Sequence, residues 1–223
     1  KNMFSPKVIL LPVLVMLTVF SAQAQKPEAM EWSIGNYFKN LPKKYKTFRG
    51  DFDPLTKETT IIDEPNGYAA YLSHPIIPDS INPPFPIFET ALFKSQIEPP
   101  LLVVSNLIDA DDCSDYETFF LRRVGSNWTE VKSRVLPPLD LKMFWDAPQS
   151  SERLLKLIKR NFIAYHFEPP RRGTQMKVSL EICYRIAGDS PDEKVQEFEK
   201  LVESAKPIYL DWDKQTGKFK FAK

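Results

Sequence analysis

The acidic segment 109–117 is the densest group of possible metal ligands in the sequence. Hard carboxylate oxygens at this density are what Ca²⁺ requires. The segment departs from the EF-hand loop, however, because it has no Gly at the sixth position and no Glu at the twelfth. A solvated hairpin loop is the preferred interpretation, with a metal site as the alternative, and we expect no cofactor. The ligands of such a site would be Asp109, Asp111, Asp112 and Asp115.

A second possible site is the basic surface of a helix predicted over 148–161. Its apolar stripe is Leu154, Leu157 and Ile158, and the remaining surface is positively charged and could bind a polyanion. A solvated helix surface is preferred, because no aromatic residue is interleaved with the charges to stack on bases or sugars. The basic residues are Arg153, Lys156, Lys159 and Arg160.

Catalytic motifs are scarce in this chain. His74 and His166 are too far apart in sequence to form a helix-borne pair of metal ligands, and a hydrogen-bonded structural role is preferred for His166. The seven glycines form neither a phosphate loop nor a dinucleotide fingerprint. Asn127-Trp128-Thr129 fits the N-glycosylation acceptor pattern, which matters only in a eukaryotic host.

Residues 1–24 read as a signal peptide. Lys1 and Lys7 precede the apolar run Val8–Phe20, and Ala22-Gln23-Ala24 fits the small-x-small cleavage pattern. The run is too short and too interrupted by Pro12 for a membrane span. We therefore expect export to the periplasm or the extracellular space, no membrane span after cleavage, and one globular domain over 25–223.

Export to an oxidising compartment favours a disulfide between the two cysteines. An even count in an oxidising compartment predicts a disulfide between Cys113 and Cys183, with two unpaired apolar thiols as the alternative. Removing Lys1 and Lys7 leaves 28 basic against 29 acidic side chains, a net charge of −1. Nothing in that balance attracts nucleic acid or an anionic membrane.

The elements that must position these residues are mostly strands. Apolar runs on either side of Glu64-Pro65-Asn66-Gly67 predict a hairpin over 59–73. The run 101–136, broken by the acidic segment and by Gly125-Ser126-Asn127, predicts a three-stranded meander. Between them, 74–100 contains seven of the twenty prolines, which predicts a long connection with one short strand over 87–93.

The C-terminal part, 162–222, is also predicted to be mostly strands. Strands are predicted over 162–167 and 176–187, the second with Met176, Val178 and Leu180 on one face. Ser190-Pro191-Asp192-Glu193 is a capping box that starts an amphipathic helix over 191–205. A final hairpin over 207–222 turns at Gly217.

Together these features predict an α+β fold: a largely antiparallel sheet of about seven to nine strands, which could wrap into a sandwich, with two amphipathic helices packed on it. The predicted function is an exported, non-catalytic binding protein whose ligand is a protein or a glycan. A small secreted hydrolase that uses a carboxylate pair is the alternative, because such pairs leave no sequence signature.

Overall fold

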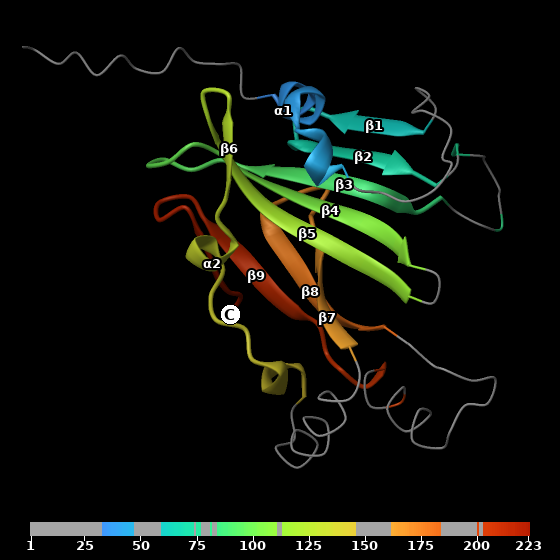
Figure 1. Cartoon of the computed structure of the whole chain (residues 1–223). Coiled ribbons are helices and arrows are strands. Elements are labelled where there is room, and N and C mark those ends of the chain that lie inside the picture. Colours follow the sequence, from blue (N-terminus) through green and yellow to red (C-terminus); the bar gives the residue numbers. More distant parts are fainter. Residues whose placement is uncertain are drawn as a thin grey trace, which may run out of the picture. The chain divides into compact units, whose positions relative to one another are not determined.

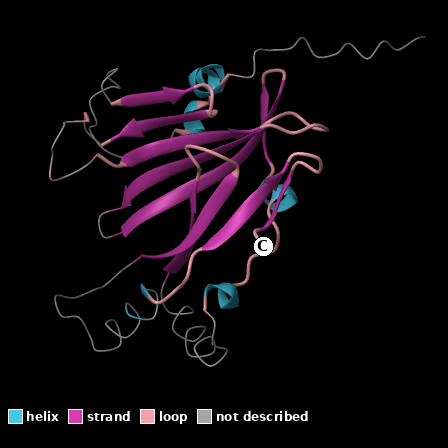
Figure 2. Cartoon of the chain, turned by 180° about the vertical axis from the view of Figure 1, so that it is seen from behind, coloured by secondary structure: helices cyan, strands magenta, loops and turns pink. Residues whose placement is uncertain are grey.

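The computed structural model describes residues 33–46, 59–73, 75–76, 81, 84–110, 113–145, 162–183, 200 and 203–223. Within them the chain is mostly antiparallel β-sheet with a few short helices (Figures 1 and 2). Ten strands are described, more than the seven to nine that were expected. The described helices include none that is long and apolar enough to cross a membrane.

Six strands form the first sheet in the order β1-β2-β3-β4-β5-β6, so each pairs with its neighbours in sequence. The predicted hairpin around Gly67 and the predicted meander are both confirmed. Gly67 and Gly125 adopt φ of 65° and 61°, the left-handed conformation that these turns require. The bounds are β1 Thr60–Asp63, β2 Tyr68–Leu72, β3 Pro86–Phe93, β4 Leu101–Ala110, β5 Cys113–Val124 and β6 Asn127–Glu130.

The proline-rich stretch 74–100 contributes more than a short strand on a connection. It supplies β3, which lies between β2 and β4 and is buried over nearly its whole length. Pro86 is tolerated because it is the first residue of the strand. The sequence therefore predicted the strand but not its central position.

The meander ends earlier than expected. β6 stops at Glu130, and one helical turn, α2 (Lys132–Val135), replaces the predicted strand to residue 136. Val131 and Val135, four residues apart, are both buried, whereas β6 is short and largely exposed. The apolar residues here have helical spacing, so a turn of helix buries them where a strand would not.

The second sheet has the order β10-β9-β8-β7 and is antiparallel throughout. Met176, Val178 and Leu180 lie on the buried face of β8, as its alternation predicted, and the hairpin around Gly217 is confirmed. The bounds are β7 Phe162–Glu168, β8 Gln175–Cys183, β9 Ile208–Asp213 and β10 Lys218–Phe221.

Apolar side chains from both sheets form one cluster between them. Phe120 of the first sheet and Phe167 of the second meet edge to face, with ring centroids 5.2 Å apart. Aromatic contacts of this kind hold the two sheets together, because non-polar surface is removed from water on both. Three short helical segments complete the description: α1 (Ile34–Asn40), η1 (Lys43–Tyr45) and η2 (Leu141–Phe144).

Helix α1 packs on the other face of the first sheet, where Phe38 meets Tyr71 and Phe88. The N–H groups of Ile34 and Gly35 each donate to the Glu64 carboxylate at 2.9 Å. A Cβ at Gly35 would lie 2.6 Å from a Glu64 oxygen. Glycine has a low helix propensity, but here the absence of a side chain leaves room for the Glu64 carboxylate that caps α1.

The predicted helix over 148–161 lies outside the described residues. Of the one predicted over 191–205, only Lys200 and Glu203 are described as helical, and the Ser204 N–H donates to the Lys200 carbonyl at 3.1 Å. The coarse prediction, a largely antiparallel α+β fold, is therefore confirmed, and the two packed amphipathic helices stay a prediction.

Candidate functional site

Most of the side chains that the sequence singled out lie outside the described residues. Asp111 and Asp112 fall between β4 and β5, and the side chains of Asp109 and Asp115 are not described either. Among the described residues there is no group of three or more His, Cys, Asp or Glu side chains arranged to hold a metal ion. The basic set at 153, 156, 159 and 160 also lies outside them.

The two cysteines belong to different sheets. Cys113 is the first residue of β5 and Cys183 the last of β8, but neither side chain is described, so the disulfide stays a prediction. His74 lies outside the described residues, and His166 is half-buried on β7. Asn127 is exposed at the start of β6, where a glycan would be accessible.

An open groove lies on one side of α2, and we call it the α2 groove. Its volume is about 740 Å³. This size is typical of pockets that bind small ligands, as is a lining that is mostly apolar with a few polar groups. The lining residues are Glu130, Lys132, Ser133, Leu136, Pro137, Pro138, Leu139, Tyr165 and Phe167.

The segment that borders the groove is fixed at both ends by buried residues. Val135 is buried at one end, and Phe144 is buried at the other, where its ring stacks on Tyr165 at 5.9 Å. Between these points Pro137 and Pro138 cannot donate hydrogen bonds and keep the backbone extended. Leu136 and Leu139 of this segment pack against the core cluster and also line the groove, so they form part of its apolar wall.

Lys132 supplies a positive charge to the α2 groove. Its ammonium group lies 5.0 Å from the ring centre of Phe167 and 6.0 Å from that of Phe120. Burial lowers the pKa of Lys132, and the nearby carboxylates of Glu130 and Glu117 oppose that shift. The groove therefore has a cation over two aromatic faces and the carboxylate of Glu130 within an otherwise mostly apolar lining.

A smaller, more enclosed cavity lies on the other side of α2, and we call it the Arg122 cavity. Its volume is about 300 Å³, and Ser133 lines both it and the α2 groove. The lining residues are Glu98, Arg122, Val131, Ser133, Arg134, Val135, Gly217 and Lys218.

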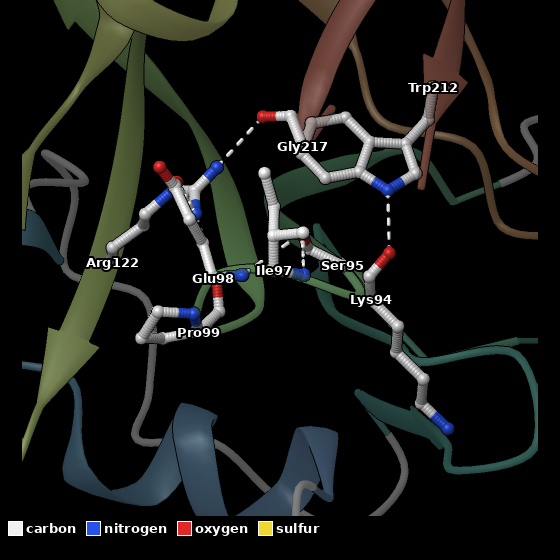
Figure 3. Close-up of polar contacts among 8 residues, drawn as sticks. All are labelled: Lys94, Ser95, Ile97, Glu98, Pro99, Arg122, Trp212 and Gly217. Atoms are coloured by element: carbon white, nitrogen blue, oxygen red, sulfur yellow. Dashed lines mark hydrogen bonds and ion pairs between the residues drawn. The ribbon is translucent and has the colours of Figure 1, made fainter. Parts of the chain in front are cut away.

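Arg122 is 6% exposed and makes contacts with two distant segments (Figure 3). Its Nη2 donates to the Gly217 carbonyl at 2.8 Å and its Nη1 to the Pro99 carbonyl at 3.3 Å. Nη1 also forms an ion pair with Glu98. Burial lowers the pKa of Arg122, and the charge of Arg134 adds to that effect. Arg122 therefore joins the 95–99 loop and the β9–β10 turn to β5.

A buried acid, Glu89, lies on β3 and is 9% exposed. The Tyr68 hydroxyl donates to its Oε2 at 3.0 Å. Burial raises the pKa of Glu89 to about 7. The Tyr68 hydrogen bond and the charge of His166 oppose this shift and the charge of Glu168 adds to it, but desolvation is the largest effect.

Glu89 continues into a polar row across the first sheet. It pairs with Ser105 of β4, which pairs with Thr118 of β5, and all three are buried. Within the described part of the chain, the Ser105 and Thr118 hydroxyls find no hydrogen-bond partner. Buried polar groups without hydrogen-bond partners lower the stability of a protein, so stability alone does not explain this row.

Sequence reasoning did not identify Lys132, Arg122 or Glu89. The available signal was a charged residue in a strand with two buried faces, as in Phe88-Glu89-Thr90 and Leu121-Arg122. A charge at such a position must find partners inside the protein. The partners themselves come from distant segments and leave no local pattern.

Comparison with known proteins adds little. The chain matches no protein-family model and no curated protein. A solved structure of a domain of an uncharacterized protein from Porphyromonas gingivalis W83 is similar over 73% of each chain, with 12% sequence identity and a TM-score of 0.43. A similarity this weak carries no argument about function.

Proposed function

We propose that this protein is an exported, non-catalytic binding protein whose ligand occupies the α2 groove. The observation that carries the proposal is the groove itself, about 740 Å³ in volume, with mostly apolar walls and the charged side chains of Lys132 and Glu130 at its lining. Pockets of this size and lining are typical of ligand sites. The ligand is a protein segment or a small molecule with an apolar group and a negative charge, rather than a glycan, because leucine and proline walls offer few hydrogen bonds to sugar hydroxyls.

The location and the finer fold are part of the same proposal. The signal peptide over 1–24 implies export to the periplasm or the extracellular space, where a bridge between Cys113 and Cys183 would be stable. The domain over 25–223 would then be a sandwich-like arrangement of the two sheets, with the helices over 148–161 and 191–205 packed against it. These statements rest on the sequence pattern.

The alternative, a hydrolase with a carboxylate pair, has one observation in its favour, the raised pKa of Glu89 beside the charge of Glu168. Both acids, however, already have partners within the protein. Tyr68 donates to Glu89, and Glu168 accepts from Ser179 at 3.2 Å and pairs with Lys177 at 2.7 Å. A catalytic pair must reach a substrate, so this arrangement favours a structural role.

The test uses anilinonaphthalene sulfonate, a fluorescent probe with an apolar body and one negative charge, added to the purified chain. We expect saturable binding at one site. Leu139→Glu places a negative charge in the groove wall and should abolish binding, and Pro138→Glu, at an exposed position, should weaken it without disturbing the core. Lys132→Gln should weaken binding because it removes the cation.

Matched controls separate the groove from general changes of surface. Ile81→Glu changes an apolar residue that is 94% exposed, and Lys142→Gln removes an exposed lysine that does not line the groove. Both should bind the probe as the parent chain does. Equal binding by the groove variants and the controls, at unchanged melting temperature, would contradict the proposal, as would an absence of binding by the parent chain.

A further inference from the structure

The Arg122 cavity has an excess of positive charge. Three basic residues line it, Arg122, Arg134 and Lys218, against one acid, Glu98. The carboxylate of Glu98 is already in an ion pair with Arg122. Two cationic groups are therefore left around a small cavity without an anion to balance them.

Arg134 and Lys218 are both exposed, and no described residue pairs with either side chain. Arg134 and Arg122 line the same cavity, and the charge of Arg134 contributes to lowering the pKa of the Arg122 guanidinium. An anion in the cavity would therefore be attracted by Arg134 and Lys218 together. The hydroxyl of Ser133, on the same turn of helix, adds a hydrogen-bond donor to the lining.

The inner wall of the cavity is fixed by Arg122. Its hydrogen bonds to the Gly217 and Pro99 carbonyls hold the guanidinium in place, and its Nε, buried with the rest of the side chain, has no acceptor among the described residues. Gly217 has φ of 62°, and a Cβ there would lie 3.0 Å from Arg122 Nη2. The wall is therefore rigid before any ligand arrives, which reduces the entropy lost on binding.

We propose that the Arg122 cavity binds a tetrahedral oxyanion, phosphate or sulfate, free or carried on a larger molecule. Arg134 and Lys218 supply the charge, Ser133 a neutral donor, and Arg122 the positive inner wall. Guanidinium and ammonium groups form charge-assisted hydrogen bonds with such oxygens. A volume of about 300 Å³ accommodates the ion with part of its hydration shell. The site does not depend on the α2 groove, since the two share only Ser133 as a lining residue.

The test measures binding of inorganic phosphate, inorganic sulfate and phenyl phosphate to the purified chain by amide NMR, at ionic strength held constant with sodium chloride. Saturable shifts around residues 133–135 and 217–218 are expected. Arg134→Gln and Lys218→Gln should each weaken binding by about tenfold or more, and the double variant should abolish it. Phenyl phosphate binding more tightly than phosphate would assign the site to a group carried on a larger ligand, and equal affinity would assign it to the free ion.

Arg172→Gln and Lys39→Gln are the matched controls, because both residues are exposed and neither lines the cavity. They should bind phosphate and sulfate as the parent chain does. Binding that survives in the double variant would overturn the proposal, and so would the same shifts in a separate titration with sodium chloride alone. Arg134 and Lys218 are both exposed, so loss of binding at an unchanged melting temperature is the expected result and would support the proposal.

Discussion

Arg122 and Glu89 are both charged residues in the interior of the same sheet, and their surroundings differ. Arg122 donates to two carbonyls and pairs with Glu98, so its charge is compensated on several sides. Glu89 has the Tyr68 hydroxyl as its hydrogen-bond donor and lies beside the unsatisfied hydroxyls of Ser105 and Thr118. Arg122 therefore links separate segments of the chain, whereas the carboxyl group of Glu89 is buried with few polar groups to stabilise its charged form.

The difference shows in how each group responds to burial. Arginine keeps its proton at all ordinary pH values, so the fold must supply acceptors, which it does. A carboxyl group can instead take up a proton, and burial raises the pKa of Glu89 to about 7. A buried charge that cannot be neutralised is therefore found with several partners, whereas a group that can be neutralised is tolerated with one hydrogen-bond donor, the Tyr68 hydroxyl.

The largest expected effect is from Arg122→Met. The substitution keeps much of the apolar volume but leaves the Gly217 and Pro99 carbonyls without donors and Glu98 without its partner. We expect the free energy of unfolding to fall by about 3 to 5 kcal/mol. Urea denaturation at pH 7 measures it, and a loss below about 1 kcal/mol would show that Arg122 does not tie the segments together.

Glu89→Gln should stabilise the protein in a pH-dependent way. In the folded protein the carboxyl stays protonated up to a pKa of about 7, but in the unfolded chain it ionises near its ordinary value of 4.5. Stability is therefore fully present below pH 4.5 and is lost as the pH rises through 7. The glutamine variant should be more stable than the parent chain by up to about 3 kcal/mol at about pH 8, and by little at about pH 4.

Unfolding by urea at a series of pH values gives this difference. Tyr68→Phe sharpens the test, because the Tyr68 hydrogen bond lowers the pKa of Glu89, and its removal should move the pH transition upward. A glutamine variant that is equally stabilised or destabilised at every pH would show that Glu89 is not buried as a neutral acid.

Trp212→Phe tests a second contact near the segments that Arg122 joins, a hydrogen bond from Trp212 to Lys94 (Figure 3). The Trp212 indole N–H donates to the Lys94 carbonyl at 2.7 Å, and the ring packs on Phe219 at 5.0 Å. Losing the donor and part of the ring should cost about 2 kcal/mol. Trp145→Phe, which loses an exposed hydrogen bond to Ser204, should cost less than about 1 kcal/mol. Equal losses of unfolding free energy in the two variants would show that burial does not strengthen these hydrogen bonds.

The smallest effect is expected from Glu98→Gln. The Glu98 side chain is 50% exposed, so its ion pair with Arg122 is screened by water and salt. We expect a loss below about 1 kcal/mol, decreasing further in high salt. A larger loss, comparable with that of Arg122→Met, would mean that the ion pair rather than the two carbonyl contacts holds Arg122.

The sequence predicted those parts of the fold that local chemistry determines. The turns at Gly67, Gly125 and Gly217 need positive φ, and the alternation along β8 needs only the period of a strand, so each can be recognised within about ten residues. The early end of β6 was missed because Val131 and Val135 suit a strand or a helix equally well until the surrounding packing is known.

The candidate sites were missed for a different reason. Arg122 and Gly217 are 95 residues apart, and Tyr68 and Glu89 are 21 apart, so no sequence window contains both partners. The α2 groove depends on where Pro137 and Pro138 pass relative to β7, which follows from tertiary packing. The acidic segment 109–117 and the basic residues of 153–160 are recognisable in the sequence by their local charge density. Charge density does not reveal which charged side chains are buried.

The most direct test of the proposed function is an amide NMR titration of the chain with anilinonaphthalene sulfonate. If the α2 groove is the ligand site, the shifts should be confined to residues 132–136, Leu139, Tyr165 and Phe167, and should saturate together with one affinity. Shifts centred instead on the exposed Tyr209 and Phe221, or spread over both sheets without saturation, would contradict the assignment of the groove as the binding site.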